Sequence, residues 1–436
     1  MSQFRLARLC LMLAAIGVTA PALVTSAHAQ QKTDAPAAAA AAKDTVRPEL
    51  FKLLDPAAIK PLMDAKNYGE VQNRITQAEA FPNRTPYEDY VLNRMKLSLG
   101  SATNNNAIAM PALEAVINSG RLQGAEQADF IQALANMHYN AKDYPKAIEW
   151  FKRYQKDSPT PEKIRPSLVR AYYLSGDFAT AKSELLPMIA EMEKAGKTPT
   201  EEDLRLLASA SNKVKDDAGY LTALEKLVSY YPNDDFWTDV LNRGVARKSG
   251  FDAQVNMINV YRLEFAAVKQ MAPEEYVDLA ELSLRDGFPT EAKKVIEAGY
   301  AAGVLGKGSN AKTHAALRDK ANKGAADDAK NIASGEASAA KAKTGAGLVN
   351  LGWAYATMDQ HDKGIQFIQQ GIAKGSLKNA EEAKLRLGMA QARGGKTAEA
   401  IKTFESVKGG AGAGDLAKYW ILLLNQKQGG KQTAAM

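Results

Sequence analysis

The chain has 436 residues, 56 of them basic and 49 acidic, so its net charge is +7 at neutral pH. Charges of both signs are mixed along the chain without a long block of like charges, which argues against a nucleic-acid-binding or membrane-binding arm. A chain of this length exceeds what one hydrophobic core usually organises, so a stack of smaller units is expected.

The first 29 residues have the features of an export signal. Two arginines precede an apolar run at Leu9–Val18, and Ala27–Ala29 has the small-residue pattern that signal peptidase cuts. The run is too short to span a bilayer, so we expect cleavage after Ala29 and a periplasmic mature chain. Cys10, the only cysteine, is removed with the predicted signal peptide. We therefore expect the mature protein to contain no disulfide, no thiolate metal ligand and no cysteine nucleophile.

Residues 30–47 form an Ala-rich polar stretch with almost no large apolar side chain, and we predict a disordered linker there. Structure is expected to begin at Pro48, where the first cluster of large apolar residues starts. No later apolar run approaches 18 residues, so no transmembrane segment is predicted in the mature chain.

An internal repeat dominates the rest of the chain. Residues 128–161 align with residues 162–195 without a gap, so that Leu134 falls on Leu168 and Ala147 on Ala181. A period of 34 residues corresponds to a helix, a turn and a second helix. Such a unit cannot bury its own apolar face and must stack on its neighbours, which predicts an all-α solenoid.

The repeat resembles the tetratricopeptide repeat, whose pattern sets large apolar, small and aromatic residues at fixed positions. In the best copy these positions hold Ile131, Leu134, Ala135, His138, Ala147, Phe151 and Pro159. Further copies begin near Glu162, Glu201, Asp234, Pro273, Gly345 and Glu381. The resemblance implies a right-handed α-solenoid, in which the small residues at positions 8 and 20 let the two helices of a hairpin approach closely.

The distribution of these copies predicts the domain boundaries. We expect divergent helical repeats at 48–127, tetratricopeptide-like repeats at 128–305, a degenerate Ala/Lys/Gly-rich repeat at 306–344, further repeats with a capping helix at 345–428, and a disordered tail at 429–436. The segment 306–344 offers little apolar area to bury, so we predict that it is the least stable part of the stack. Thr200 and Asn379 are predicted helix N-caps.

Catalytic and cofactor motifs are weak. Gly395-Lys396 resembles part of a phosphate loop but lacks the required earlier glycine and preceding strand. The histidines His138, His314 and His361 lie far apart and have no metal-ligand spacing, so neither a metal nor a cofactor is predicted. His138 takes an aromatic packing position of the repeat, which favours a structural role.

Carboxylate pairs leave one enzymatic alternative open, because exported enzymes that cleave glycans need only two acids at a set separation. The candidates are Glu201, Glu202, Glu274, Glu275, Glu381 and Glu382. All of them begin predicted helices, where the helix dipole already favours acids. We therefore predict a non-enzymatic protein, with a peptidoglycan-acting envelope enzyme as the alternative.

The resemblance also implies a binding surface, since positions 2, 5, 9, 12 and 13 of each first helix line the concave groove of tetratricopeptide solenoids. In this chain these positions give the candidate partner-binding residues Gln132, Asn136, Tyr139, Asn140, Arg170, Tyr173, Arg205, Ser209, Asn212, Lys213 and Trp353. Amide and guanidinium groups can grip a peptide backbone or carboxylate, and tyrosine adds rigid contact area. Alternatively, they are solvated polar residues of an ordinary helix face.

From Tyr87 onward the sequence is similar to exported tetratricopeptide proteins of Gram-negative bacteria, some of which are associated with TonB-type energy-transduction systems. This resemblance implies a protein partner in the cell envelope and supplies no catalytic residue. We expect a scaffold or adaptor that binds a partner peptide or helix and does not bind nucleic acid. The partner and the oligomeric state are left open.

Overall fold

The structure is a computed structural model that describes residues 44–409 and 412–433. The predicted signal peptide at 1–29 and most of the linker at 30–47 lie outside these residues. The described residues form helices and contain no strand, which confirms the predicted all-α class. They also contain no helix that is long and apolar enough to span a membrane. The chain divides into two compact units, with the boundary between Glu184 and Leu185.

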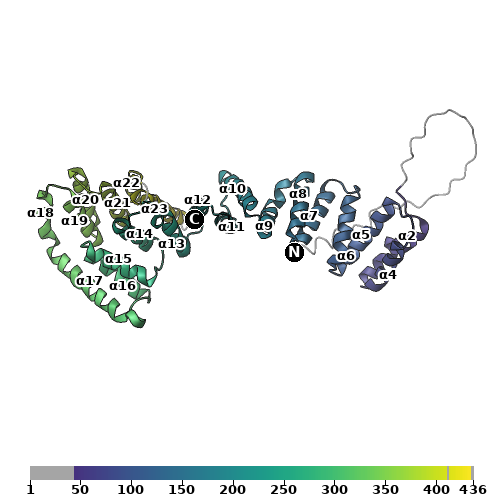
Figure 1. The fold of residues 1–436 in the computed structure, drawn as a ribbon, viewed down its shortest axis with the longest axis horizontal. Helices are drawn as coiled ribbons and strands as arrows, with labels where there is room; N and C mark the ends of the chain where they lie inside the picture. The colour runs from purple at the N-terminus through teal and green to yellow at the C-terminus, as the bar shows by residue number, and fades with distance from the viewer. Residues whose placement is uncertain (1–43, 410–411, 434–436) are drawn as a thin grey trace, which may run out of the picture. The chain divides into compact units, whose positions relative to one another are not determined.

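Unit 1 is a series of packed helices (Figure 1). Its elements are α2 (Pro48–Leu54), α3 (Pro56–Asp64), α4 (Tyr68–Glu79), α5 (Pro86–Ala102), α6 (Asn106–Asn118), α7 (Gly124–Asn140), α8 (Tyr144–Asp157), η2 (Pro161–Ile164), α9 (Arg165–Ser175) and the first part of α10 (Phe178–Lys194). Helices α2 and α3 pack on α4, and each helix from α4 to α8 packs on the next. The first helix of the described residues begins at Pro48, where the sequence predicted the start of structure.

The core of unit 1 follows the repeat pattern. Ile131, Leu134 and Ala135 of α7 are fully buried, as is Phe151 of α8. His138 is also buried, as its packing position predicted. These side chains fill the space between successive hairpins, because the period of the repeat brings them to one face of each helix.

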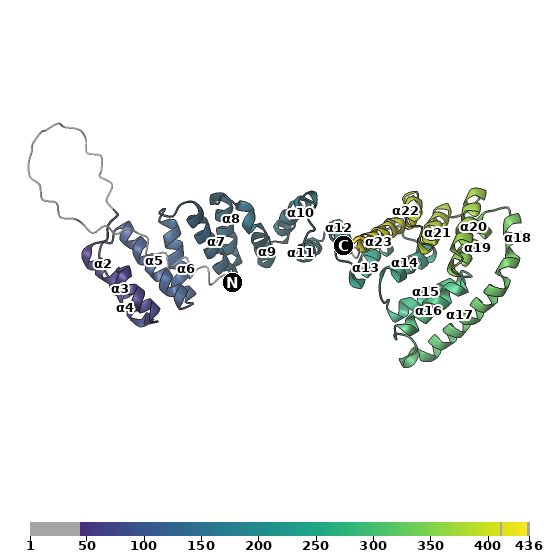
Figure 2. The same cartoon turned by 180° about the vertical axis from the view of Figure 1, so that it is seen from behind.

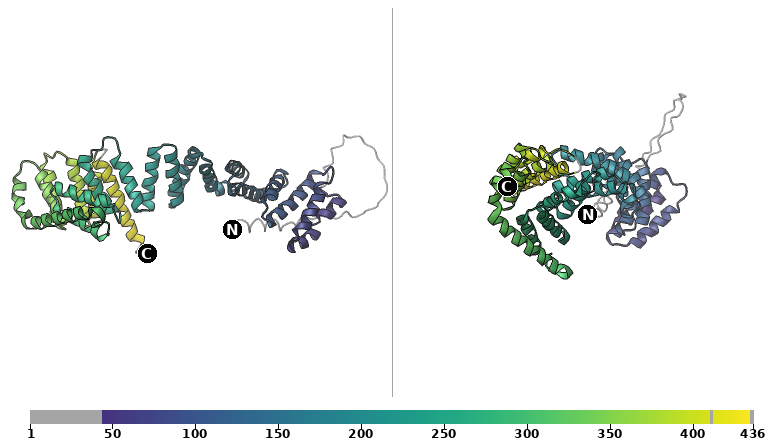
Figure 3. Two further views of the ribbon diagram at one scale, coloured as in Figure 1. Left: turned by 60° about the horizontal axis from the view of Figure 1, so that its bottom comes forward. Right: turned by 60° about the vertical axis from the view of Figure 1, so that its left-hand side comes forward.

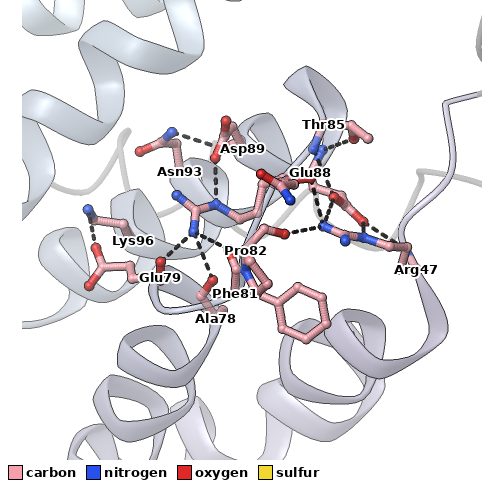
Figure 4. Close-up of polar contacts among 12 residues, drawn as sticks. Arg47, Ala78, Glu79, Phe81, Pro82, Thr85, Glu88, Asp89, Asn93 and Lys96 are labelled. Atoms are coloured by element: carbon pink, nitrogen blue, oxygen red, sulfur yellow. Dashed lines mark hydrogen bonds and ion pairs between the residues drawn. The ribbon is translucent and has the colours of Figure 1, made fainter.

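Polar contacts fix the beginning of unit 1 (Figure 4). The Glu88 carboxylate is fully buried and accepts hydrogen bonds from the Arg47 side chain and from the backbone N–H of Thr85. Its bonds with the Arg47 guanidinium hold the pKa of Glu88 at about 2. Arg84 donates to carbonyl oxygens at the end of α4 and pairs with Asp89 at 2.7 Å. Through Arg47 and Arg84, α2 and α4 are joined to the first turn of α5.

Unit 2 by itself is also a succession of helical hairpins (Figure 2). It contains the rest of α10, then α11 (Glu201–Lys213), α12 (Asp217–Tyr230), α13 (Asp234–Leu241), η3 (Asn242–Ala246), α14 (Ala253–Ala267), α15 (Pro273–Arg285), α16 (Pro289–Ala301), η4 (Gly308–Asn310), α17 (Ala311–Asn331), η5 (Ile332–Gly335), α18 (Glu336–Lys341), α19 (Ala346–Thr357), α20 (His361–Lys374), α21 (Ala380–Arg393), α22 (Thr397–Glu405) and α23 (Ala413–Thr433). The last helix therefore extends past residue 429, where a disordered tail was predicted.

The segment 306–344 differs from the other hairpins because it combines the 21-residue helix α17 with the six-residue helix α18. Only His314, Leu317, Ala321 and Ala325 of α17 are buried, and no residue of α18 is buried. The predicted low stability of this segment stays a prediction, and the small buried area is consistent with it.

The last helix returns to the earlier helices α12 to α14 of unit 2. α23 packs against α21 and α22, and also against α14 and η3 (Figure 3). The Tyr419 hydroxyl donates to the Glu225 carboxylate of α12 at 2.8 Å, and Lys248 pairs with Asp415 at 2.6 Å. In the π-helical segment η3, a Cβ on Gly244 would lie 2.2 Å from the Tyr419 hydroxyl, so glycine is needed there. The part of unit 2 from α12 onward is thus closed by α23.

The hairpin of α19 and α20 shows why small residues occupy positions 8 and 20 of the repeat. Gly352 and Gly364 hold these positions, and an added Cβ on either would lie 2.6 Å from the other's carbonyl oxygen. Such a distance is shorter than any relaxed contact, and backbone atoms cannot move aside as a flexible side chain could.

Replacing Gly364 with alanine is therefore expected to lower the free energy of unfolding by about 1–3 kcal/mol, because the two helices must separate. Gly347→Ala in α19 is the matched control, since its Cβ would lie 3.6 Å from the nearest atoms of Ala339. This control should be neutral or slightly stabilising, because alanine favours the helix. Urea denaturation of both variants measures the difference, and equal stability would contradict the proposed close approach.

Candidate functional site

A pocket of about 370 Å³ lies at the first helix of the repeat that begins at Glu201. Three of the residues that the sequence placed on the groove side of α11, namely Arg205, Ser209 and Asn212, line it. The other lining residues come from α11, α12 and α13 and are Ala208, Tyr220, Leu224, Leu227, Asp235, Phe236 and Asp239. We call this the α11 pocket. It combines an apolar floor with a polar rim, as small-ligand and peptide sites commonly do.

The local sequence positions α11 precisely. The Thr200 hydroxyl accepts a hydrogen bond from the backbone N–H of Asp203 at 3.1 Å, which confirms the predicted N-cap. Asn379, the other predicted N-cap, accepts no such bond. Its amide is instead 3.5 Å from the Glu382 carboxylate.

Arg205 forms one side of the α11 pocket. Its guanidinium lies 4.7 Å from the centre of the Phe236 ring and pairs with Glu201 at 2.8 Å. The planar guanidinium covers the apolar floor while its outer edge faces water, because the side chain is more than half exposed. It can therefore contact both an apolar and an anionic part of a ligand.

The opposite side is held by a network between α12 and α13. The Tyr220 hydroxyl donates to Asp239, and Arg243 pairs with Asp239 at 3.0 Å. The Arg243 guanidinium also lies 4.3 Å from the centre of the Tyr220 ring. Burial, together with the bond to Asp239, raises the pKa of Tyr220 to about 12, so the hydroxyl stays protonated at physiological pH. This side of the pocket is thus preorganised.

Two rim groups remain available for a ligand. Asn212 and Asp235 are exposed, and neither side chain forms a hydrogen bond or ion pair with another residue in the described part of the chain. An amide can donate to and accept from a peptide backbone at the same time. The free amide of Asn212, next to an apolar floor, is the feature of the pocket best suited to hold an extended peptide.

The predicted residues of unit 1 lie on α7 and α9. Gln132 and Asn136 are half-buried on α7, and Asn140 is exposed at its end. Among the described residues, none forms a hydrogen bond with these three amide groups. Tyr139 packs edge-on against Tyr144 with ring centres 5.7 Å apart.

On α9, Arg170 and Tyr173 are half-buried, and the Tyr173 ring packs against Phe178 at 5.1 Å. Lys213 is exposed at the end of α11 in unit 2. The predicted groove residues thus fall into two sets, one in each unit. That either set forms a binding surface stays a prediction.

Trp353 is a correction to the predicted groove. Its side chain is completely buried, and its indole Nε1–H donates to the Glu291 carboxylate at 3.3 Å. A partner cannot contact this ring on the surface of unit 2. Its position in the repeat predicted that Trp353 lines the concave groove. Other helices of unit 2 cover this position, so Trp353 packs in the interior.

The interior around Trp353 is charged. Arg262 of α14 donates to both carboxylate oxygens of Glu291, with a shortest distance of 2.7 Å, and both side chains are almost completely buried. Arg393 of α21 pairs with Glu291 at 3.1 Å, and Ser283 of α15 lies 3.3 Å from it. Burial raises the pKa of Glu291, but Arg262 and Arg393 outweigh burial and lower it below the ordinary value. No sequence motif indicated this group, which we call the Glu291 cluster.

At least four of the six carboxylates weighed as catalytic candidates have structural partners in the described part of the chain. Glu201 pairs with Arg205, Glu381 with Lys384 at 2.7 Å, and Glu382 with Arg386 at 2.6 Å. Glu275 accepts a hydrogen bond from the backbone N–H of Ala272 at the start of α15. These contacts agree with helix capping and with ion pairing between residues three or four positions apart on one helix. The described residues contain no acidic or histidine cluster suited to a metal ion.

Glu264 of α14 is a buried carboxyl that the sequence did not single out. Burial raises its pKa to about 7, although the Thr238 hydroxyl donates to it at 2.8 Å and Glu275 adds a smaller repulsion. A carboxyl that prefers to be protonated in the folded state loses part of its stabilising environment when it ionises.

The stability of unit 2 is therefore expected to fall as pH rises from 4.5, the ordinary carboxyl pKa, through about 7. In this range the folded state binds more protons than the unfolded state, so the free energy of unfolding decreases as pH rises. Glu264→Gln should make the free energy of unfolding less dependent on pH in this range. Urea denaturation at several pH values measures this dependence for both proteins. Parallel curves for the two proteins would contradict the assignment.

One hairpin of the chain matches the model of a known protein family. Residues 382–409 match the tetratricopeptide repeat family. The match covers most of α21 and all of α22 and coincides with the repeat predicted from Glu381. No curated protein matches the chain significantly.

Several solved structures resemble the chain weakly. A TPR2AB domain of yeast Sti1 in an HSP90 complex is 16% identical with a TM-score of 0.23, and the match covers 65% of this chain and 90% of that one. The tetratricopeptide domain of P58(IPK) is 14% identical, with a TM-score of 0.21 and coverage of 88% and 99%. A Rap protein complexed with competence and sporulation factor is 13% identical, with a TM-score of 0.23 and coverage of 88% and 98%. Because these scores are low, no partner or activity is transferred from these proteins.

Proposed function

We propose that this protein is a scaffold or adaptor of the bacterial cell envelope that holds a peptide segment of a protein partner. The α11 pocket carries the proposal, because it joins an apolar floor to the unpaired amide of Asn212 and to the Arg205 guanidinium. An apolar side chain of the peptide would enter the floor, and Asn212 would bind the adjacent peptide group. Gln132, Asn136 and Asn140 offer further amides on unit 1.

The envelope location rests on the sequence. The pattern of residues 1–29 supports export, and the likeness to exported tetratricopeptide proteins supports a partner in the envelope, such as a component of a TonB-type system. Cell fractionation with N-terminal sequencing tests this part of the proposal. A periplasmic chain that begins at Gln30 is expected, whereas an uncleaved chain in the cytosol would contradict it.

Photocrosslinking in cells tests the binding site. A photoreactive amino acid at Asn212 is expected to give a specific protein adduct, and the same amino acid at Thr222, an exposed position of α12 outside the pocket, should not. The probe can then be placed at Ser209 in an Arg205→Ala, Asn212→Ala background. Loss of the adduct supports the pocket, and an adduct of equal yield overturns it.

An enzymatic role is tested separately. The mature protein is incubated with purified peptidoglycan, and soluble fragments are measured. The scaffold proposal expects none, while release that depends on an acidic pair such as Glu381 and Glu382 would replace it with the glycan-cleaving alternative.

A further inference from the structure

A second and larger pocket lies between α14 and α15, outside every residue that the sequence pattern selected. Its volume is about 510 Å³. The lining residues come from two adjacent antiparallel helices and are Ala253, Gln254, Met257, Tyr261, Asp278, Glu281, Leu282 and Arg285. We call it the α14–α15 pocket. None of its residues belongs to the Glu291 cluster or to the α11 pocket.

The floor of the α14–α15 pocket is apolar and adaptable. Met257, Tyr261 and Leu282 are partly buried there and leave an apolar surface open to solvent. Methionine is flexible and polarizable, so it fits ligands of different shape. A linear aliphatic chain is therefore a suitable occupant of the floor.

The rim carries negative charge. The Tyr261 hydroxyl donates to the Asp278 carboxylate at 3.1 Å, which holds this carboxylate against the pocket. Burial and the neighbouring Asp278 raise the pKa of Tyr261, so the hydroxyl remains a donor. Glu281 is exposed, and its side chain has no hydrogen-bond or ion-pair partner among the residues that the structure describes.

The one cation of the pocket is already neutralised. Arg285 pairs with Asp286 at 2.9 Å, so Asp278 and Glu281 leave the pocket with net negative charge. The surrounding segment is acidic as well, since residues 252–286 contain seven carboxylates and three basic side chains, in a chain whose net charge is +7. An anionic ligand or an acidic membrane surface would be repelled here.

We propose that the α14–α15 pocket receives a lysine or arginine side chain from an apolar, basic segment of a protein partner. Its aliphatic stem lies on Met257 and Leu282, and its cationic group lies between Asp278 and Glu281. Long cationic side chains combine an apolar stem with a charged end, which matches this floor and rim. Charge-assisted hydrogen bonds to the two carboxylates provide the specificity.

This site is independent of the α11 pocket, so the protein would hold a partner at a second point. The two sites also differ in chemistry, since the α11 pocket offers an amide and a guanidinium to a peptide backbone. The α14–α15 pocket selects positive charge instead.

A binding experiment with defined peptides tests the proposal on the mature chain. Fluorescence anisotropy compares a labelled peptide of alternating leucine and lysine with the same peptide in which glutamate replaces lysine. In an Arg205→Ala, Asn212→Ala background, where the α11 pocket is disabled, the lysine peptide is expected to bind more weakly as salt increases and the glutamate peptide is expected not to bind. Failure of the lysine peptide to bind, or equal binding of both peptides, would overturn the proposal.

Variants then locate the site. Asp278→Asn with Glu281→Gln should weaken binding of the lysine peptide by at least about tenfold, since two charge-assisted bonds are lost. Glu274→Gln, an exposed acid of the same helix outside the lining, is the matched control and should change the affinity less than about twofold. An equal loss in both variants would show nonspecific attraction and overturn the pocket. Circular dichroism confirms that each variant is folded.

The α11 pocket variants separate this proposal from the proposed function. Arg205→Ala with Asn212→Ala should leave in place the part of the lysine-peptide binding that Asp278 and Glu281 provide. If these variants abolish that binding instead, the peptide occupies the α11 pocket and the second site is wrong.

Discussion

Replacing Glu291 with glutamine is expected to lower the free energy of unfolding of unit 2 by about 3–5 kcal/mol. The substitution keeps the shape of the side chain but leaves Arg262 without its buried counter-charge and weakens the contact with Arg393. Losing one member of a buried ion pair is costly because the other charge stays in a poorly solvated interior. Hydrogen exchange in α14, α16 and α19 and urea denaturation measure the effect.

Asp359→Asn is the control for this prediction. Asp359 pairs with Lys294 at 2.6 Å, but both side chains are well exposed, so its loss should cost less than about 1 kcal/mol. The difference between wild type and Glu291→Gln should shrink as pH falls below 4.5, because the lowered pKa of Glu291 stabilises the fold only while its carboxylate is charged. Similar losses in the two variants would show that the Glu291 cluster does not stabilise unit 2.

Trp420→Ala is the second substitution with a large expected effect, a loss of about 3–5 kcal/mol. The indole is almost completely buried, and its ring stacks on Phe404 with centres 5.7 Å apart. Because α23 packs on α14 and η3 as well as on α21 and α22, the cavity would loosen all of these contacts together. Faster hydrogen exchange is therefore expected in η3 as well as in α22.

Two controls accompany the Trp420 variant. Lys418→Ala removes an exposed partner of Glu225 on the same helix and should have little effect. Trp420→Phe should be milder than alanine, since it keeps a ring and removes an indole N–H that is buried without a hydrogen-bond partner among the described residues. If exchange in η3 stays unchanged in Trp420→Ala, η3 and α22 are not coupled through α23.

The local structure could be predicted because its causes are local. Thr200 caps α11, and Gly352 and Gly364 take the small positions where two helices meet, all as the repeat pattern indicated. The weak N-cap at Asn379 shows the limit of such signals, since its amide lies beside Glu382 instead. The α11 pocket was partly predictable, because the position rule selected three of its residues.

The long-range contacts could not be predicted in the same way. Arg393 and Glu291 are 102 residues apart in sequence, and Tyr419 and Glu225 are 194 apart. Whether such residues meet depends on the small rotation between successive hairpins, which accumulates over several repeats. The sequence therefore placed Trp353 on an accessible face, whereas the structure buries it against Glu291.

By itself the sequence determined the helical hairpins, their close internal packing and the face that carries polar side chains, since these follow from residue spacing within about 34 positions. Only the tertiary structure decided that unit 2 closes through α23. It also brought the Glu291 cluster and the α14–α15 pocket together. The physical reason is that the curvature arises from side-chain packing between successive hairpins. The rotation at each interface adds to the next over several repeats, and no pattern within one repeat predicts the sum.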